Sequence, residues 1–530
     1  MTFEIETRDG TEETVLVTKN PATLEVNDRV VETSPEGVER AVACAETAQR
    51  EWAARSIEER IEVFERVRDL LLERKESIAR TVSEEVGKPV GEALVYELGA
   101  ALSAVEFVTG QGPGLLDEPI PIQSFSSVGE SRLLREPIGV VGVITPWNFP
   151  FGIPAFEVVP ALFAGNGVVM KPAEATPRSA FEFHDLLFDA GVPEDLFVVV
   201  PGRGSVTGQA LVESDIAHLS FTGSSEVGLE LERACSERGI SLSRECGGSD
   251  PAVVLPDAGV EFTASGVVSM RFGNAGQMCA AVKRLYVHES VEEDLREEIL
   301  ERIENLRVGY GPDEAFEVGP LISEGALENV HSQVERSVEM GAEVLLGGEP
   351  MDRDGHFYEP TVLTNVSRDM PVVTEETFGP VLPIVSYETV DEAVELANDT
   401  RYGLSASVWT TDTERGEEVA RRIEAGTVLV NDHCYTAALF ETPWGGYGDT
   451  GGDFSHGRWA IESVTRTKHV HVTPGEPSLR QGRFENPWWF PYDGDSADFM
   501  SRTLELMYSP NVATKLRNAP SVMREMFAKR

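Results

Sequence analysis

The chain has 530 residues, of which 41% are hydrophobic and 25% charged, and it contains no low-complexity tract, so globular domains are expected. Its 90 acidic residues outnumber its 45 basic ones, and the resulting formal charge of −45 argues against nucleic acid or an anionic membrane surface as a partner. No apolar run reaches the roughly 18 residues of a membrane helix, and the acidic start MTFEIETRDGTEE does not resemble a signal peptide, so we expect a cytoplasmic protein.

The excess of acidic residues is spread over the body of the chain and does not form a tail. Residues 471–530 hold eight Lys or Arg and seven Asp or Glu, while the other 470 residues carry 37 basic and 83 acidic groups. Such a body repels itself at low ionic strength, and salt of about 1 M, where the Debye length is about 3 Å, screens the repulsion. The charge therefore favours a halophilic source over an ordinary acidic protein.

The cysteines give no sign of a metal site or a disulfide framework. There are five, and no CxxC or Cys/His spacing typical of zinc occurs among them. So few thiols in so long a chain argue against disulfides, and we expect no bound metal. The five are Cys44, Cys235, Cys246, Cys279 and Cys434.

The first third of the chain is predicted to be largely helical. Ser34-Pro35-Glu36 is a favourable helix start, with proline at the first helical position. The spacing of Ser56 and Glu59 is that of a capping box, and apolar residues then recur at helical spacing from Ile61 to Ile78. These patterns predict one helix after Ser34 and another after Ser56.

A different pattern begins at Gly139, where short apolar runs bounded by glycine or proline alternate with helical stretches. Strands buried on both faces of a parallel sheet have this pattern. The predicted fold class is therefore α/β, with two halves that meet between residues 245 and 280, where a ligand cleft is expected. The expected strands are Gly139–Thr145, Gly167–Lys171, Leu196–Pro201 and Ile216–Thr222 in the first half, and Ala252–Leu255, Arg284–His288, Ala342–Leu346, Val381–Tyr387, Ser405–Thr410 and Thr427–Asn431 in the second.

Two glycine-rich segments follow expected strands and precede expected helices. Residues 202–208, GRGSVTG, are similar to a dinucleotide-binding fingerprint but one residue too long for it. Residues 221–228, FTGSSEVG, lie where free backbone amides and the helix dipole would suit a phosphate. Each segment is also consistent with a plain turn between a strand and a helix, so the residues alone leave both interpretations open.

Three side chains form a candidate catalytic set, although each also has an ordinary structural explanation. Cys279 follows small polar residues, as a substrate-facing thiol would, yet most cysteines are inert and buried. Asn148 lies between two prolines, where a restrained amide suits an oxyanion site as well as a simple turn. Glu245 precedes two glycines and suits either a general base or a structural ion pair.

Together these segments resemble the NAD(P)-dependent aldehyde dehydrogenase superfamily, of the hydrolytic, non-acylating type. The resemblance covers residues 18–472, and the 34 residues from Glu245 to Cys279 match the family's spacing. It implies an aldehyde dehydrogenase-like fold, with a Rossmann-like cofactor domain, an α/β catalytic domain and a small β oligomerisation element. The segments that carry it are TPWNFP (145–150), KPAEATP (171–177), FTGSSEVG (221–228), ECGGSDP (245–251), NAGQMC (274–279), EETFGPV (375–381) and PWGG (443–446).

The resemblance implies that an aldehyde is oxidised to its carboxylate in two steps. Cys279 is expected to attack the aldehyde and form a thiohemiacetal, whose oxyanion is held by the Asn148 side chain and the Cys279 amide. A hydride then passes to the nicotinamide. Glu245 is expected to activate the water that hydrolyses the resulting thioester.

The resemblance also implies a site for NAD. Glu174 is expected to favour NAD over NADP, because it would bond to the ribose 2′-hydroxyl and repel a 2′-phosphate. Lys171 is expected to share that ribose, Ser224 to hold the pyrophosphate, and Glu376 with Phe378 to hold the nicotinamide and its ribose. The other expected cofactor residues are Thr145, Pro146, Trp147, Gly204, Gly208, Phe221, Gly223, Gly228 and Gly247.

The expected substrate is an apolar or bulky aldehyde. Succinate-semialdehyde dehydrogenases commonly have an arginine where this chain has Gly273, although Arg271 is a candidate substitute, so an enzyme of that type is the alternative. The residues expected to line the substrate tunnel are Phe156, Met278, Ala280, Tyr435 and Trp444.

Three other functions are less favoured by the same residues. Coenzyme A-acylating relatives generally lack the glutamate that stands here as Glu245, and non-catalytic members of the family tend to lose the nucleophile. A cysteine hydrolase requires a histidine base, and none is near Cys279 in the sequence. Two departures from the family pattern, Cys246 and residues 447–452, are expected to alter packing or loop contacts and to leave the chemistry unchanged.

The resemblance also divides the chain into parts. Residues 1–248 are expected to form the cofactor-binding domain, to which 437–457 return, and 249–436 the catalytic domain. Residues 122–136 and a strand in 458–475 are expected to join a neighbouring subunit's sheet in a homodimer or homotetramer. Residues 476–530 form an aromatic-rich extension, expected to pack on this subunit or a neighbour.

Overall fold

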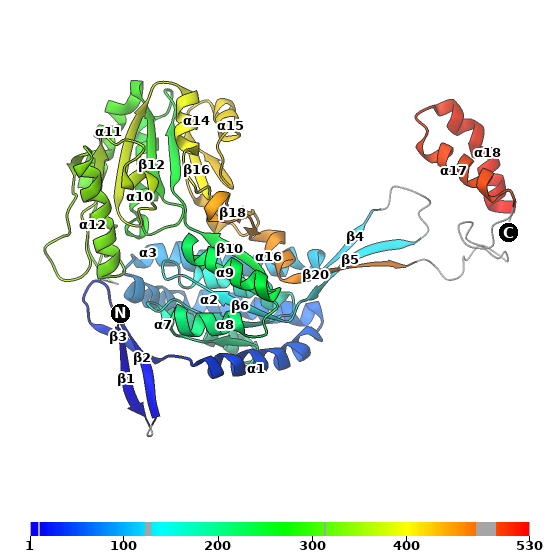
Figure 1. Cartoon of the computed structure of the whole chain (residues 1–530), viewed down its shortest axis with the longest axis horizontal. Coiled ribbons are helices and arrows are strands. Elements are labelled where there is room, and N and C mark those ends of the chain that lie inside the picture. Colours follow the sequence, from blue (N-terminus) through cyan, green and yellow to red (C-terminus); the bar gives the residue numbers. More distant parts are fainter. Residues whose placement is uncertain (1, 9–10, 122–128, 312–313, 473–493, 529–530) are drawn as a thin grey trace. The chain divides into compact units, whose positions relative to one another are not determined.

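The chain forms two compact units, and the computed structural model describes most of both (Figure 1). The first unit contains Met1–Leu115 and Glu136–Arg466, and the second contains Leu116–Arg135 and Thr467–Arg530. Both predicted α/β halves lie in the first unit. The described residues are 2–8, 11–121, 129–311, 314–472 and 494–528.

The chain begins with an antiparallel sheet that the sequence patterns did not predict. Its strands, in the order in which they pair, are β1 (Thr2–Arg8), β2 (Thr11–Lys19) and β3 (Val26–Val31). Helices α1 (Pro35–Ala53) and α2 (Ile57–Val86) follow, so both predicted helix starts are confirmed. Ser34 accepts a hydrogen bond from the amide of Gly37, and Ser56 with Glu59 forms the complete capping box of α2.

The first α/β sheet has five parallel strands. They are β6 (Val140–Ile144), β7 (Gly167–Lys171), β8 (Phe197–Val199), β9 (His218–Gly223) and β10 (Ser241–Cys246). Four match predicted strands, and β10 was not predicted. The spatial order β10-β9-β6-β7-β8 means that the chain leaves β6 to one side and later returns to the other. In an open α/β sheet a ligand binds at the carboxyl ends of the strands where the order reverses, which is here between β6 and β9.

The second sheet has seven strands in the order β13-β14-β15-β12-β11-β16-β17, all parallel except the β13–β14 pair. All six strands predicted for this half are present, and β14 is additional. The strands are β11 (Asp250–Val254), β12 (Val282–His288), β13 (Glu343–Leu346), β14 (Thr361–Thr364), β15 (Val381–Tyr387), β16 (Ser405–Trp409) and β17 (Thr427–Val430).

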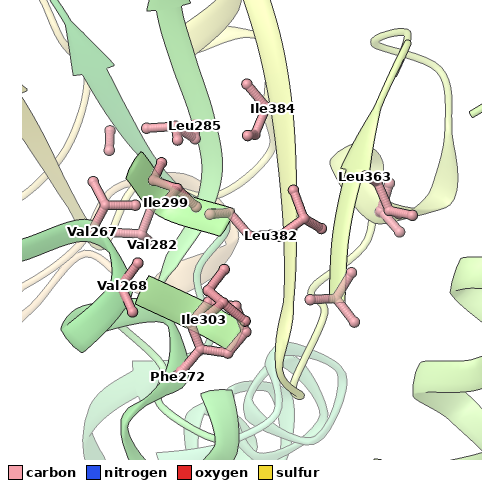
Figure 2. Packing of buried hydrophobic residues seen from close by; sticks show 14 of the residues in the cluster. Val267, Val268, Phe272, Val282, Leu285, Ile299, Ile303, Leu363, Leu382 and Ile384 are labelled. Carbon is pink, nitrogen blue, oxygen red and sulfur yellow. The ribbon is translucent and has the colours of Figure 1, made fainter. Parts of the chain in front are cut away.

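Helices cover both faces of the second sheet (Figure 1). The side chains of β12 alternate, because Leu285 packs towards α10 and α11 while Tyr286 packs towards α14 and α15. Figure 2 shows Phe272 of α10 beside Ile303 of α11, and Val282 of β12 beside Ile299 of α11. Burying each such side chain stabilises the fold by about 1.5–3 kcal/mol. The helices are α10 (Val260–Phe272), α11 (Glu289–Glu304), α12 (Glu324–Glu339), α14 (Val390–Asn398) and α15 (Thr413–Ala420).

One continuous helical run, Val90–Gly110, is long and apolar enough to cross a membrane among the described residues. It consists of α3 (Val90–Glu92), a π-helical segment η1 (Ala93–Leu98) and α4 (Gly99–Gly110). Half of its most apolar stretch is buried within the protein, where it packs against α2 and against α6 (Gly152–Phe163). These contacts are those of a core helix.

Short elements and connecting helices complete the first unit. They are α7 (Pro177–Ala190), η2 (Gly204–Gly208), α8 (Gln209–Glu213), α9 (Ser225–Arg238), η3 (Gly273–Gly276), α13 (Pro371–Thr374), η4 (Tyr435–Ala438), β18 (Trp444–Gly445), η5 (Gly448–Thr450), β19 (Phe454–Ser455) and α16 (Gly457–Ser463).

The second unit holds most of a three-stranded sheet and a pair of helices. The strands, β4 (Asp117–Ile120), β5 (Glu130–Pro137) and β20 (Thr465–Val472), lie in the order β20-β5-β4. Helices α17 (Ser496–Tyr508) and α18 (Val512–Ala528) pack on each other, and α5 (Gly112–Leu116) precedes β4.

The expected oligomerisation element is only partly described. Residues 122–128 lie outside the described residues, and so do residues 473–493, which hold most of the aromatic cluster of the extension. The part of segment 458–475 that is described differs from a single strand, because it includes most of helix α16 before β20 begins.

Candidate active site

A mostly apolar cavity of about 300 Å³ is lined by residues from both α/β halves. Cys279 and Glu245 both line it, so the structure brings the expected nucleophile and the expected base together. Val95 and Tyr435 line it and are each 60% exposed, which marks the mouth of the cavity. The five residues expected to form a substrate tunnel all lie in its wall: Phe156, Met278, Ala280, Tyr435 and Trp444.

The segment before Cys279 has an unusual backbone conformation. Asn274 and Ala275 have φ angles of 49° and 54°, in the left-handed region that residues with side chains avoid, and Gly276 follows at 75°. A side chain at Gly276 would collide with the carbonyl oxygen of Gly379, so the turn requires glycine. Strain of this kind persists where the surrounding structure enforces it, commonly at functional sites.

Asn148 lies in the loop after β6, and its backbone is held by a buried ion pair. The Nζ of Lys88 donates to the Asn148 carbonyl oxygen at 2.6 Å and to Glu97 Oε1 at 2.8 Å. Asn274 Nδ2 donates to the same carbonyl oxygen at 3.2 Å. The Asn148 side chain donates from Nδ2 to the carbonyl oxygen of Gln277 at 3.1 Å, which directs its amide towards the loop of the expected nucleophile. A fixed amide is what an oxyanion site requires.

The Cys279 sulfur is protonated at neutral pH. Burial raises the pKa of the Cys279 thiol to about 12, and the nearby Lys283 ammonium opposes the shift. The thiolate is the nucleophilic form of cysteine, so a proton acceptor has to take this proton before attack. The Glu245 carboxyl group lies in the wall of the same cavity.

Glu245 is the second-last residue of β10 and is only 7% exposed. Ser455 hydrogen-bonds the Glu245 carboxyl group through its side chain and its backbone, while Glu245 Oε2 is buried without a hydrogen-bond partner. Desolvation raises the pKa of Glu245 well above its usual range, and the neighbouring Glu157 carboxyl group adds to the shift. A carboxyl group with a raised pKa suits proton transfer near neutral pH.

Two buried histidines lie near the cavity, and both are neutral. The ring of His456 packs 4.2 Å from that of Phe156, and burial lowers the pKa of His456 to about 3. Burial likewise lowers the pKa of His433 to about 4. Within the described structure neither imidazole is hydrogen-bonded to the Cys279 thiol, so the cysteine-hydrolase alternative finds no histidine base there.

The charged residue types in the cavity wall are all acidic. Glu157, Glu245 and Asp432 line it, and no lysine or arginine is among the described residues that do so. Arg271, the candidate partner for a substrate carboxylate, is completely buried and donates to backbone carbonyl groups of Val282, Thr377 and Gly379. Arg271 is therefore not available to bind a substrate carboxylate in place of the arginine that succinate-semialdehyde dehydrogenases have at the position of Gly273.

On the expected nicotinamide side, paired charges and aromatic rings surround the nucleophile. Lys283 Nζ donates to Glu376 Oε1 at 2.6 Å and to the backbone carbonyl oxygen of Cys279 at 2.8 Å. Phe378 packs edge-on against Trp147, with ring centroids 5.6 Å apart. A side chain at Gly247 would overlap the Glu376 carboxylate, so glycine there permits the close approach.

On the expected adenosine side, the structure brings four of the named residues together. Lys171 ends β7, and its Nζ lies 3.4 Å from Glu174 Oε1. The same Glu174 oxygen accepts from the amide of Gly204 at 2.8 Å. A side chain at Gly208 would touch the stem of Lys171, so glycine keeps this region open.

The helix start after β9 suits a phosphate. Ser224 caps α9 by accepting from the amide of Val227 at 3.4 Å, and α9 has 14 residues, so its first-turn amides and dipole favour an anion. Gly228 has a packing role, because a Cβ there would lie 2.7 Å from Arg244 Cδ and from Cys246 Sγ. The remaining expected residues lie at the carboxyl ends of β6 and β9, where the strand order reverses: Thr145, Pro146, Phe221 and Gly223.

These donors fit a dinucleotide. A carboxylate stands at each expected ribose position, Glu174 on one side and Glu376 on the other, and carboxylates are good acceptors for ribose hydroxyl groups. The helix start at Ser224 provides for a pyrophosphate, which completes the requirements of NAD(P).

Four residues that matter to this geometry were missed by the sequence patterns. Lys88 stands between Gly87 and Pro89, and Glu97 lies in an apolar helical run. Lys283 is the second residue of β12 and is followed by Arg284, while Glu157 is the single charged residue in the helix GIPAFEVVPALF. A charged residue isolated in an apolar element must be paired or neutral when buried, and this was the available signal for Glu157 and Glu97.

Comparison with known proteins agrees with this geometry. The family model described as the aldehyde dehydrogenase family matches residues 7–470. A protein of Mycobacterium ulcerans, named "Putative succinate-semialdehyde dehydrogenase (NADP+) 2", is 37% identical over 438 residues, which cover 82% of this chain and 84% of the relative.

Solved structures with the same fold point the same way. The NAD-dependent aldehyde dehydrogenase of Sinorhizobium meliloti superposes with a TM-score of 0.84 and 36% identity over 90% of this chain and 94% of its own. The aldehyde dehydrogenase of Bacillus cereus in its NAD+ complex gives a TM-score of 0.83 and 33% identity over 89% and 97%. The chain belongs to the aldehyde dehydrogenase family and is an NAD(P)-dependent oxidoreductase that acts on aldehydes.

Proposed function

We propose that this enzyme oxidises an uncharged aldehyde, apolar or bulky, to its carboxylate with NAD, and that Cys279, Glu245 and Asn148 carry the chemistry. The single observation that carries the substrate assignment is the cavity wall, which is mostly apolar and has carboxyl groups but no described cation. A buried carboxylate without a partner is costly, and like charges repel, so an acidic semialdehyde would bind poorly there.

The cavity positions of Cys279 and Glu245, and the contact of Asn148 with the loop before Cys279, support the mechanism that we propose. The Cys279 thiol releases its proton to solvent, and the Cys279 sulfur bonds to the aldehyde carbon. The oxygen that gains charge is held by the Asn148 amide, which its loop contacts orient, and by the Cys279 amide. Bound NAD supplies the hydride acceptor. Glu245 then accepts a proton from water, whose oxygen bonds to the thioester carbon while the carbon–sulfur bond breaks.

The second candidate substrate is succinate semialdehyde. The name of the mycobacterial relative favours it, since that protein is 37% identical to this chain. Against it stand the glycine at Gly273, the engagement of Arg271 with backbone carbonyl groups, and the acidic cavity wall.

The preference for NAD over NADP rests on Glu174. Its carboxylate faces the expected adenosine ribose, where it would repel a 2′-phosphate. The nearest arginine in the glycine-rich segment, Arg203, is paired with Glu32, with Nη2 and Oε2 2.5 Å apart, so it does not offset that repulsion. The names of similar proteins include both NAD and NADP enzymes.

The substrate and the base are tested together with a panel of aldehydes. The reaction is run in molar salt and followed by the absorbance of NADH. We expect hexanal and benzaldehyde each to give a kcat/KM at least about tenfold above that of succinate semialdehyde. With Glu245→Gln, the first turnover should still release NADH in a burst while steady turnover falls by about 10²-fold or more. A preference for succinate semialdehyde would reverse the substrate assignment, and unchanged steady turnover would remove Glu245 as the base.

The remaining features of the proposal concern the whole protein. We propose residues 1–248 as the cofactor-binding domain and 249–436 as the catalytic domain, supported by the first sheet ending at Cys246 and the second beginning at Asp250. We also propose a homodimer or homotetramer, as the family resemblance implies. We further propose a cytoplasm of high salt, which the formal charge of −45 supports.

A further inference from the structure

Two of the three acidic residues that line the cavity with the nucleophile are Glu157 and Glu245. Glu157 projects from α6, an otherwise uncharged helix, and Glu245 from the end of β10, and both line the cavity. Ser220 of β9 hydrogen-bonds the Glu157 carboxyl group, just as Ser455 fixes that of Glu245. A serine therefore hydrogen-bonds each carboxyl group, and both carboxyl groups lie in the wall of the same mostly apolar cavity.

No lysine or arginine is among the described residues that line the cavity around the two groups. The Asp453 carboxyl group also acts on Glu245, and Arg244 acts on Asp453. The imidazole of His456 is neutral, and the ammonium of Lys88 near the start of α6 is already paired with Glu97 at 2.8 Å. The other titratable groups in the wall are Tyr96, Cys246, Cys279, Asp432, Cys434 and Tyr435.

Resting on the proposed function, we propose that Glu157 is a positioning residue that acts through Glu245: from its place in the wall of the same cavity, the charge on Glu157 decides when Glu245 is free to take a proton from the deacylating water. In that step the water proton goes to Glu245 and the water oxygen bonds to the thioester carbon. The carbon–sulfur bond breaks, and the sulfur takes up a proton as the acid leaves.

The electrostatics give this coupling its direction. Burial raises the pKa of Glu157 to about 7, while the bond from Ser220 lowers it. The pKa of Glu245 is raised further, because it is desolvated and lies beside the Glu157 carboxyl group. As pH rises, Glu157 loses its proton first, and its negative charge then delays ionisation of Glu245. Removing the charge at Glu157 lets Glu245 ionise at lower pH.

The test measures hydrolysis of the thioester directly. Full-length enzyme with NAD is mixed with benzaldehyde, and decay of the acyl-enzyme mass is followed by rapid quenching and intact-protein mass spectrometry from about pH 5 to about pH 10. Plotted against pH, the rate of acyl-enzyme decay should fall on the acid side of its profile, which we call the acid limb. We expect Glu157→Gln, which keeps an acceptor for Ser220, to move this acid limb at least about one pH unit lower while the NADH burst is unchanged. Ser220→Ala should move the limb in the same direction by less, because Glu157 then keeps its proton to higher pH.

Matched variants separate the possible failures. Glu106→Gln removes an exposed carboxylate on α4 and should leave the limb in place. If Glu245→Gln retains the burst and loses hydrolysis, but Glu157→Gln and Ser220→Ala both leave the limb within about 0.2 units of the parent, the role of Glu157 is refuted and that of Glu245 survives. If Glu245→Gln hydrolyses the thioester normally, the proposed function itself fails. Should Glu157→Gln not fold, the shift in Ser220→Ala decides.

Discussion

The cofactor side and the substrate cavity treat charge in opposite ways. On the cofactor side each named charge has a partner: Lys171 lies 3.4 Å from Glu174, and Lys283 lies 2.6 Å from Glu376. In the cavity, the described part of the chain places no lysine or arginine beside the carboxyl groups, and it gives Glu245 Oε2 no hydrogen-bond partner.

This difference follows from what each region has to do. A dinucleotide brings fixed charges and hydroxyl groups, so its site needs donors and acceptors that are ionised and held in place. The cavity has to accept an uncharged aldehyde and move protons, and desolvated carboxyl groups with raised pKa values suit that task. The paired charges therefore mark the region that binds the cofactor, and the carboxyl groups without a described cation mark the region that carries out the chemistry, within one unit of the fold.

The largest expected effect comes from removing the nucleophile, which tests whether the two regions are independent. Cys279→Ala should lower NADH production at least about 10⁴-fold, because the covalent step is lost. NAD binding, measured by calorimetry, should stay within about twofold of the parent, since the backbone carbonyl oxygen that Lys283 contacts remains.

Cys44→Ala is the matched control, because Cys44 is an exposed thiol on α1. It should retain the parent activity. Residual activity in Cys279→Ala above about a tenth of the parent rate would contradict covalent catalysis.

The sequence predicted the fold and most of the site because both depend on local patterns. All ten predicted strands exist, since apolar runs between glycines and prolines are typical of buried parallel strands. The amphipathic edge strand β10 was missed, with only its last two residues buried, and so were β1 to β3 before the helices.

What the sequence could not predict are the contacts that join distant segments. Lys88 holds Asn148 across 60 residues, and Glu157 acts on Glu245 although 88 positions separate them. Neither pair shares a local pattern, because the two members meet only when helices pack on the sheet. Both involve a charged residue isolated among apolar ones, which signals a partner without identifying it.

A cation placed at the mouth of the cavity should make the cavity resemble the cofactor side, where carboxylates and cations are paired. Val95 lines the cavity and is 60% exposed, so Val95→Arg can reach a substrate carboxylate at little cost in packing. A charge-assisted bond contributes about 1.5–3 kcal/mol, so the ratio of kcat/KM for succinate semialdehyde to that for hexanal should rise about tenfold or more.

Val95→Gln controls for size and polarity and should change the ratio by less than about threefold. If both variants raise the ratio equally, bulk at the mouth explains the effect and charge does not. If neither does, Val95 does not contact the substrate.

The smallest expected effect tests the cofactor side. Glu174→Gln keeps an acceptor for a ribose hydroxyl group but removes the charge that repels a 2′-phosphate, and it releases Lys171, 3.4 Å away, to attract one. The ratio of kcat/KM with NAD to that with NADP should fall about tenfold, mostly through a lower KM for NADP. Glu414→Gln, at an exposed position on α15, should leave the ratio unchanged. If kcat/KM with each cofactor stays as in the parent, the adenosine ribose lies elsewhere. If kcat/KM falls equally with both cofactors, so that the ratio is unchanged, Glu174 organises the Gly204 amide and does not select between them.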